Sequence, residues 1–373
     1  MDLRTCSPSD IGRLLTGALA GEYALAPVAD PATAALFAGF SSVDVPHAAV
    51  VVATSGSTGT PKAVVLTSDA LLASARATQD RLGGPATWHL ALPAHYVAGL
   101  MVLVRSHVAG LEPRVAAADL SDLDPAPGRN VVSVVPTQLV RALDDRRVTR
   151  TLAQMDAVLL GGAAADTGLL ERSRDLGIPV VTTYGMSETC GGCVYDGVPL
   201  GGTLVSVGDD ERIWLGGASS FSGYLGRPEL TATTLVPDPT GAHRGPGVLT
   251  HDRGRLDAVR LTVLGRLDDV VISGGVNVDL AEVQRAVDAL ATAHGLGASA
   301  VIGVPDVEWG ALVTLASEPP TRELAWWRDH LPLGRPALPR RAVALGALPR
   351  TSSGKIDRTE LARHLGSTHG DTV

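Results

Sequence analysis

The stretch Ala48–Leu66, AAVVVATSGSTGTPKAVVL, places two short apolar runs on either side of a loop of small residues. The first run, Ala48–Ala53, is typical of a buried strand, and Val64–Leu66 of a second short strand. The loop between them reads Thr54-Ser55-Gly56-Ser57-Thr58-Gly59-Thr60-Pro61-Lys62. Its glycines can turn backbone N–H groups toward an anion, and its hydroxyls and lysine add donors and charge. This pattern predicts a phosphate-binding loop rather than a plain surface loop. Pro61 and Ala63 exclude a Walker A motif.

Beyond this loop, short apolar runs alternate with segments of helical spacing. Strands are expected at 88–92, 131–135, 158–160 and 180–183, and helices near 68–82, 138–143 and 167–176. Ser68 or Thr67 can cap the first of these helices. Alternating strands and helices predict an α/β fold with mostly parallel sheets covered by helices. Residues 197–264 read as a small β region, and residues 1–45 as a short helix and loops.

The chain is expected to contain two domains. Residues 1–266 would form the large N-terminal domain that binds nucleotide and substrate. A smaller α+β domain would cover residues 267–373, after the Gly-Arg-Leu-Asp-Asp stretch at 265–269. In this second domain we expect strands at 300–304 and 312–316 and helices near 280–290 and 358–365, the last capped by Asp357.

Composition narrows the class of protein. The chain has 373 residues, 45% hydrophobic and 19% charged, which excludes a wholly disordered protein. The net charge of −8 argues against a nucleic-acid binder, and the apolar runs are too short for membrane insertion. Three cysteines are too few for a disulfide scaffold, so a cytoplasmic location is expected. Cys190 and Cys193 have C-x-x-C spacing, but a structural zinc needs more ligands, which favours packing in a pocket wall.

The two lysines of the chain occupy loops of similar composition. Lys62 and Lys355 are the only lysines among 31 basic residues, and both lie in loops rich in Gly, Ser and Thr. Lys355 belongs to the stretch 349–358, PRTSSGKIDR, ahead of the last expected helix. Lysine differs from arginine where a slim point charge must reach one oxygen, so both lysines are candidate functional residues.

Further polar residues follow expected strands, where ligands of α/β sheets bind. In the stretch 184–189, YGMSET, Ser187 could bond a phosphoryl oxygen and Glu188 could hold Mg²⁺, or the stretch could be a strand-to-helix turn. Gly161-Gly162-Ala163 leaves room for a flat base, or forms a plain turn. Asp252 could accept from ribose hydroxyls, and Arg266 could reach the same sugar.

In this order, the motifs resemble those of the adenylate-forming enzymes, which include acyl- and aryl-CoA ligases, luciferases and peptide-synthetase adenylation domains. The likeness runs from about residue 48 to 365. It implies ATP and CoA as cosubstrates, Mg²⁺ as cofactor, and a mobile C-terminal lid. The first half-reaction would convert an acid and ATP to acyl-AMP and pyrophosphate, and the second would transfer the acyl group to a thiol. The implied roles are a phosphate loop at 54–62, nucleotide contacts from Tyr184, Gly185 and Ser187, a metal ligand in Glu188, a ribose partner in Asp252, a hinge at Asp268 and a catalytic lysine in Lys355.

Within this family, the segments 92–100 and 184–197 resemble the o-succinylbenzoate–CoA ligases of menaquinone biosynthesis. That likeness implies a dianionic substrate whose succinyl carboxylate is activated. Its pocket would include Gly191 and Gly192, either His95 or Tyr96, and Arg105 as partner of the free carboxylate. Gly274 and Gly275 would let the CoA arm approach the backbone. Another aryl or short acyl acid, a carrier-protein thiol, and a non-catalytic nucleotide-binding protein are the alternatives. The oligomeric state stays open, with a homodimer as one candidate.

Overall fold

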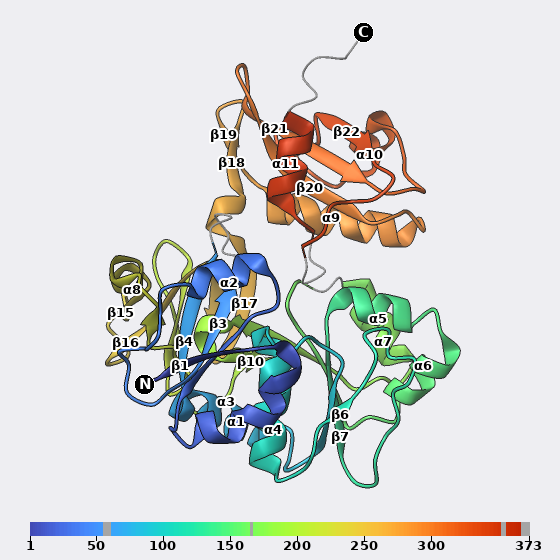
Figure 1. Cartoon of the computed structure of the whole chain (residues 1–373). Helices are drawn as coiled ribbons and strands as arrows, with labels where there is room; N and C mark the ends of the chain where they lie inside the picture. Colours follow the sequence, from blue (N-terminus) through green and yellow to red (C-terminus); the bar gives the residue numbers. More distant parts are fainter. Residues whose placement is uncertain (55–60, 165–166, 352–355, 367–373) are drawn as a thin grey trace. The chain divides into compact units, whose positions relative to one another are not determined.

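The computed structural model describes residues 1–54, 61–164, 167–351 and 356–366 (Figure 1). Their contacts divide the chain into two compact units. The first unit holds nearly all described residues up to Thr262. The second holds Thr167 and Gly168, His251–Gly254, and the described residues from Val263 onward. None of the helices in these ranges has the length and apolar character that crossing a membrane requires.

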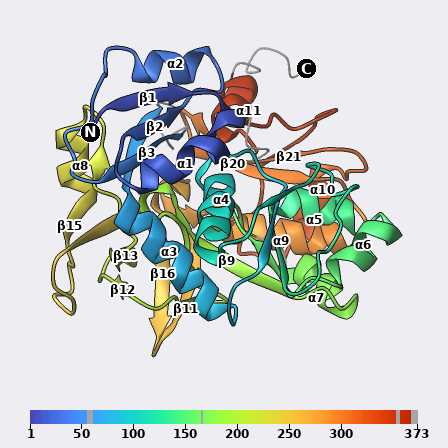
Figure 2. The same cartoon turned by 60° about the horizontal axis from the view of Figure 1, so that its bottom comes forward.

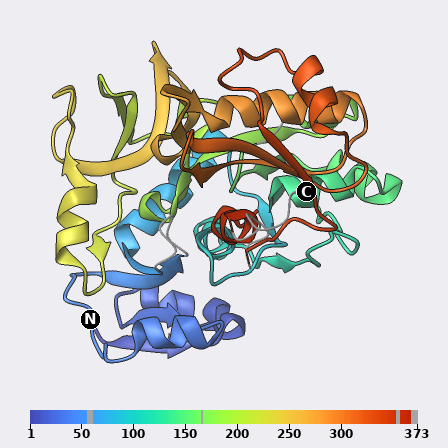
Figure 3. The ribbon, with the colours of Figure 1, turned by 90° about the horizontal axis from the view of Figure 1, so that it is seen from above.

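The first unit contains a mixed five-stranded sheet in the order β1–β2–β3–β4–β14. Its strands are β1 (Leu3–Cys6), β2 (Ala24–Pro27), β3 (Ala48–Thr54), β4 (Lys62–Thr67) and β14 (Gly223–Tyr224). β1, β2 and β3 are parallel, whereas β4 is antiparallel to both β3 and β14. Thr54 pairs with Lys62, so the two ends of the predicted phosphate loop meet across the β3–β4 hairpin. Figure 3 shows the N-terminal elements, in dark blue, gathered at one side of this unit.

A second sheet has seven strands in the order β11–β10–β9–β8–β7–β5–β6. Its strands are β5 (Thr87–Leu90), β6 (Arg114–Val115), β7 (Asn130–Val134), β8 (Ala157–Leu160), β9 (Val180–Met186), β10 (Gly191–Tyr195) and β11 (Val198–Pro199). The strands from β6 to β9 are parallel, and β10 returns antiparallel to β9. The carboxyl ends of the parallel strands therefore share one edge, which is where α/β sheets bind ligands.

Three helices lie between the two sheets, because each of these helices packs apolar side chains into a core shared with both sheets. α1 (Ile11–Leu19), α3 (Ser68–Arg81) and α4 (Val97–Ala109) share one core with strands of both sheets, and Figure 2 shows α3 and α4 side by side. The core includes Val50 and Leu66 of the first sheet, Leu100 of α4, and Val194 of the second sheet. The other face of the seven-stranded sheet packs against α5 (Pro136–Ala142), α6 (Arg146–Leu152) and α7 (Thr167–Asp175). α2 (Pro31–Phe37) packs on the first sheet.

A third, antiparallel sheet occupies the predicted β region. Its strands are β12 (Thr203–Val207), β13 (Arg212–Gly217), β15 (Leu235–Pro237), β16 (Pro246–Asp257) and β17 (Arg260–Arg266), with α8 (Pro228–Thr234) preceding β15. β16 carries the residues His251–Gly254 that belong to the second unit.

The second unit is a sheet covered on both faces. Its strands are β18 (Val270–Ser273), β19 (Val276–Asp279), β20 (Ser299–Asp306), β21 (Gly310–Ser317) and β22 (Arg341–Ala344), and its helices are α9 (Leu280–Ala293), α10 (Leu324–His330) and α11 (Arg358–Gly366). Along β20, Val301 faces the core with α9, whereas Ile302 and Val304 face the core with α11. This alternation is the two-residue period of a strand buried on both sides.

The predicted α/β class and most expected elements are confirmed. Thr67 caps α3 by accepting from Ala70 N at 3.2 Å, and Asp357 caps α11 by accepting from Glu360 N at 2.9 Å. The expectation for residues 1–45 was wrong in part, because this segment contributes the parallel strands β1 and β2. β9 also continues to Met186, so Tyr184 and Gly185 lie within a strand and not after it.

Candidate active site

A tight turn at the end of β9 presents Ser187 and Glu188. The turn is the 3₁₀ segment Ser187–Thr189, and Thr189 closes it by accepting from Met186 N at 2.9 Å and donating to Gly191 O at 2.8 Å. Cys190 follows in the left-handed region, with φ of 52°. Ser187 and Glu188 therefore stand at the edge where the parallel strands of this sheet end, which is the edge at which α/β sheets bind ligands.

Glu188 contacts Tyr224, a residue that the sequence did not single out. Tyr224 Oη donates to Glu188 Oε1 at 2.7 Å, and the Lys62 ammonium lies 5.4 Å from the centre of the Tyr224 ring. Burial raises the pKa of Tyr224, and the Glu188 carboxylate raises it further, so the phenol stays a donor at neutral pH. The structure thus gathers a carboxylate and the end of the predicted phosphate loop around one tyrosine.

Glycines allow the strands to approach closely at this edge. A Cβ on Gly185 would lie 2.1 Å from the Gly191 carbonyl oxygen, and one on Gly161 would lie 2.3 Å from Thr183 Oγ1. A Cβ on Gly192 would lie 3.0 Å from Thr183 Cβ, whereas one on Gly191 would make an ordinary contact with Met101 Cγ of α4 at 3.6 Å. Thr183 thus leaves little room for a side chain at Gly161 or Gly192. Gly162 and Ala163 are exposed at the end of β8.

The second unit contains a separate cluster of predicted residues. Arg266 donates to both oxygens of Asp268, at 2.8 and 3.2 Å, and to Asp252 Oδ1 at 3.3 Å. Burial lowers the pKa of Arg266, but the hydrogen bond and charge of Asp268, with Asp252, raise it by more. The predicted ribose-binding pair and the predicted hinge residue therefore belong to one ion-pair network.

The described residues that flank Lys355 in the sequence make contacts on each side. Residues 352–355 lie outside the described residues, as do residues 55–60 of the phosphate loop. On the near side, Arg350 pairs with Glu318 at 3.8 Å and bridges to Ile356. On the far side, Arg358 Nη1 donates to Asp269 Oδ1 at 2.9 Å, next to the predicted hinge Asp268. Burial raises the pKa of Asp269, and Arg358 opposes that rise.

The candidate acid-binding residues divide into two places. His95 and Tyr96 precede α4, with ring centres 4.2 Å apart, and burial lowers the pKa of His95 against the opposing charge of Asp30. Within the described residues, His95 Nδ1 is buried without a hydrogen-bond partner, so this nitrogen is available to form a hydrogen bond with a ligand. Arg105 lies further along α4, over the Trp88 ring at 4.9 Å, and donates to Tyr195 Oη at 3.3 Å. Its substrate role stays a prediction.

The two glycines expected to admit the CoA arm lie in the turn between β18 and β19. Both have positive φ, 60° for Gly274 and 78° for Gly275. A Cβ on Gly274 would meet the Trp309 ring at 2.6 Å, whereas Gly275 has open space. The backbone at Gly275 is therefore more open to a ligand than the backbone at Gly274.

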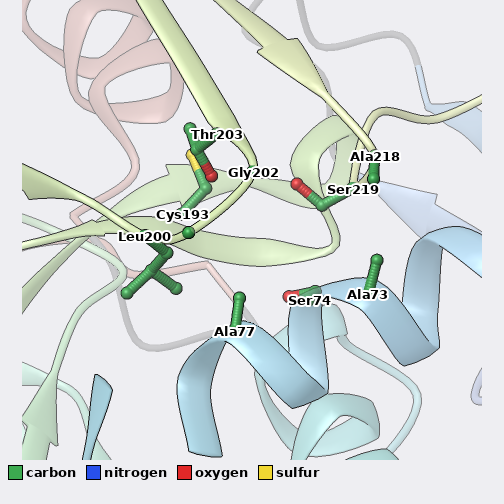
Figure 4. A pocket seen from close by; sticks show the side chains of 10 residues that line it. Ala73, Ser74, Ala77, Cys193, Leu200, Gly202, Thr203, Ala218 and Ser219 are labelled. Atoms are coloured by element: carbon green, nitrogen blue, oxygen red, sulfur yellow. The ribbon is translucent and has the colours of Figure 1, made fainter. Parts of the chain in front are cut away.

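The C-x-x-C pair is part of the packing, as expected. Cys190 is fully buried, and burial raises the pKa of the Cys193 thiol to about 12. Figure 4 shows Cys193 facing a small cavity that is otherwise lined by residues of α3 and of the segments 200–203 and 218–219. This cavity contains none of the residues of the Glu188 cluster.

Comparisons with known proteins identify the family. The family model described as "AMP-binding enzyme" matches residues 25–225. A "Probable 2-succinylbenzoate–CoA ligase" of Mycobacterium tuberculosis is 42% identical over 336 residues, covering 85% of this chain and 84% of the relative. Among solved structures, a variant of Escherichia coli MenE with bound OSB-AMS has a TM-score of 0.71 at 27% identity, over 92% of this chain and 82% of that one. Bacillus subtilis MenE in complex with the acyl-adenylate intermediate OSB-AMP has a TM-score of 0.73 at 23% identity, over 94% and 80%, and shares the fold.

Proposed function

Because the chain belongs to the AMP-binding enzyme family and, within it, to the 2-succinylbenzoate–CoA ligases, we propose that it is an ATP-dependent ligase that joins 2-succinylbenzoate to CoA. 2-Succinylbenzoate and o-succinylbenzoate are the same acid. The observation that carries the proposal is the cluster of Glu188, Tyr224 and Lys62 at the sheet edge, in a chain 42% identical to a protein of that name.

The reaction has two steps. In the first, a carboxylate oxygen of the acid attacks the α-phosphorus of ATP, and pyrophosphate leaves, which gives acyl-AMP. In the second, the CoA thiol loses its proton and attacks the acyl carbon, and AMP leaves as the thioester forms. The first step brings several negative charges together, so its catalyst must place cations and N–H donors where charge develops.

The chain offers residues for each part of the nucleotide. Residues 54–62 would bind the β- and γ-phosphates, with Lys62 as the charge, and Ser187 a phosphoryl oxygen. Tyr184, Gly185 and the stretch 161–163 would border the adenine, and Asp252 and Arg266 would bond the ribose. Lys355 would approach the α-phosphate.

Glu188 fits the role of magnesium ligand. Magnesium usually binds through one or two carboxylates together with substrate phosphates, and the Glu188 carboxylate is half-buried with one oxygen held by Tyr224. When bound, the ion would neutralise phosphate charge. Glu188 would hold that ion on one side of Tyr224, and Lys62, near the ring of the same tyrosine, would bind the phosphates.

The second unit would act as a mobile lid that turns about Asp268. The first step needs Lys355 at the α-phosphate, whereas the second needs room for a thiol, so a lid that rotates between steps serves both. Gly274 and Gly275 would then admit the CoA arm. His95, Tyr96, Gly191 and Gly192, with Arg105 at greater distance along α4, would bind the acid.

Mass spectrometry of reaction products tests this assignment. The full chain is incubated with ATP, Mg²⁺, CoA and a panel of acids that includes 2-succinylbenzoate, benzoate and short acyl acids. We expect AMP and the thioester of 2-succinylbenzoate as the main products. Equal turnover of benzoate would show that the acid assignment is wrong. A thioester formed only on a carrier protein would show that the thiol acceptor is that protein and not CoA. No turnover of any acid would refute the enzyme class.

A further inference from the structure

One hydroxyl group holds the carboxylate of Glu188. Tyr224 Oη donates to Glu188 Oε1 at 2.7 Å, and Phe221 N donates to the Glu188 carbonyl oxygen at 2.8 Å. Both the side chain and the backbone of Glu188 are therefore tied to the segment around β14. Within the part of the chain that the structure describes, no other hydrogen bond reaches this carboxylate, so Oε2 is available to a cation.

Tyr224 is itself rigidly placed. Tyr224 is 6% exposed, and the Phe221 ring contacts its ring edge-on at 4.9 Å between centroids. Its N–H donates to Thr231 Oγ1 at 2.9 Å, and β14 pairs Tyr224 with Val64 of β4. A donor fixed in this way restricts the rotation of the carboxylate that it bonds, and such partners commonly set the affinity of a metal ligand.

We propose that Tyr224 is a positioning residue whose hydroxyl orients the Glu188 carboxylate toward the magnesium ion that accompanies ATP. This inference rests on the proposed function, in which Glu188 holds that ion. The ring of Tyr224 has a separate part, because it packs on Phe221 and faces the Lys62 ammonium at 5.4 Å. Replacing only the hydroxyl therefore separates the positioning of Glu188 from packing.

The test is the Tyr224→Phe variant of the full chain, with Mn²⁺ as the probe in place of Mg²⁺. Mn²⁺ binding is followed by water-proton relaxation with α,β-methylene-ATP present and no acid. We expect the Mn²⁺ dissociation constant to rise about 10-fold or more, the usual effect of removing such a partner. Affinity for the nucleotide measured in EDTA stays unchanged, because the ring and Lys62 remain. Tyr23→Phe is the matched control, since it removes a buried hydroxyl that donates to Leu14 O at 3.0 Å.

Three outcomes would overturn the inference. The first is an unchanged Mn²⁺ dissociation constant in Tyr224→Phe. The second is a loss of Mn²⁺ affinity on adding Tyr224→Phe to Glu188→Gln that is as large as the loss in the wild-type chain. Such a loss would show that the hydroxyl does not act through Glu188. The third is a parallel loss of nucleotide affinity in EDTA and of thermal stability, which would show a structural role alone. Because no acid is present, these readings are independent of the acid assignment. A chain that binds Mn²⁺ as expected but converts no acid would refute the proposed function and leave the inference standing.

Discussion

The ion pair between Arg358 and Asp269 connects α11, which directly follows the Lys355 loop, to the segment after the predicted hinge. Its atoms are 2.9 Å apart, and the side chains are 39% and 20% exposed. The Coulomb attraction between two charges about 4 Å apart is about 4 kcal/mol at an effective dielectric constant of about 20. Burial offsets part of this gain, since it raises the pKa of Asp269 despite Arg358. We therefore expect a net value of about 1–2 kcal/mol.

Arg358→Met should cost more stability than Asp269→Asn. The first variant leaves a half-buried carboxylate without its cation, whereas the second leaves an arginine that can turn to solvent. The sign of the pH effect follows from the raised pKa of Asp269. A carboxyl whose pKa is higher in the folded state favours folding below its unfolded pKa, and this contribution is lost as the pH rises through the folded pKa. The cost of Arg358→Met should thus be full at pH 7 and shrink as the pH falls and Asp269 becomes protonated.

Hydrogen exchange of a peptide covering α11 measures this local stability. Protection is compared in the wild type, both single variants and the double variant at pH 7 and, after correction for the intrinsic exchange rate, at lower pH. We expect a coupling energy of about 1 kcal/mol between the two residues. We also expect Arg358→Met to release pyrophosphate more slowly when 2-succinylbenzoate and ATP are supplied. A coupling energy below about 0.3 kcal/mol, within the usual error of additivity, would refute the reasoning. So would a cost that does not change with pH.

Three further predictions follow from the site. Lys355→Ala should abolish pyrophosphate release yet largely spare thioester formation from supplied acyl-AMP, as followed by product assays; equal loss of both steps would contradict the lid assignment. Gly185→Ala should destabilise the first unit by about 3 kcal/mol or more in denaturant titration, since its Cβ would lie 2.1 Å from a carbonyl oxygen, whereas Gly12→Ala, with nothing within 4 Å, should not. Arg105→Ala should lower stability by about 1–3 kcal/mol through lost packing on Trp88. It should also raise the KM for 2-succinylbenzoate but not that for benzoate, because only the first acid carries a second carboxylate. An unchanged KM for 2-succinylbenzoate would show that Arg105 does not bind the acid.

Local signals in the sequence were enough for many elements and for several site residues. Thr67 precedes an apolar-periodic run and caps α3, because a cap needs only a side-chain oxygen and the N–H groups of the next turn. Ser187 and Glu188 follow an apolar run and therefore stand at the end of β9, because parallel strands bring their carboxyl ends to one edge. The expected strands at 300–304 and 312–316 lie within β20 and β21, because apolar runs of this kind predict buried strands.

Long-range pairing decided the rest. β1 and β2 have four residues each and no clear alternation, so they are strands only because β3 completes their sheet. Tyr224 and Glu188 are separated by 36 residues, and Tyr224 meets Glu188 because β14 adds to β4 at the sheet edge. No spacing rule connects two such residues, because their distance depends on which strands pair. The sequence by itself therefore determined the local elements and the kind of chemistry, whereas the tertiary structure alone decided which side chain orients the carboxylate.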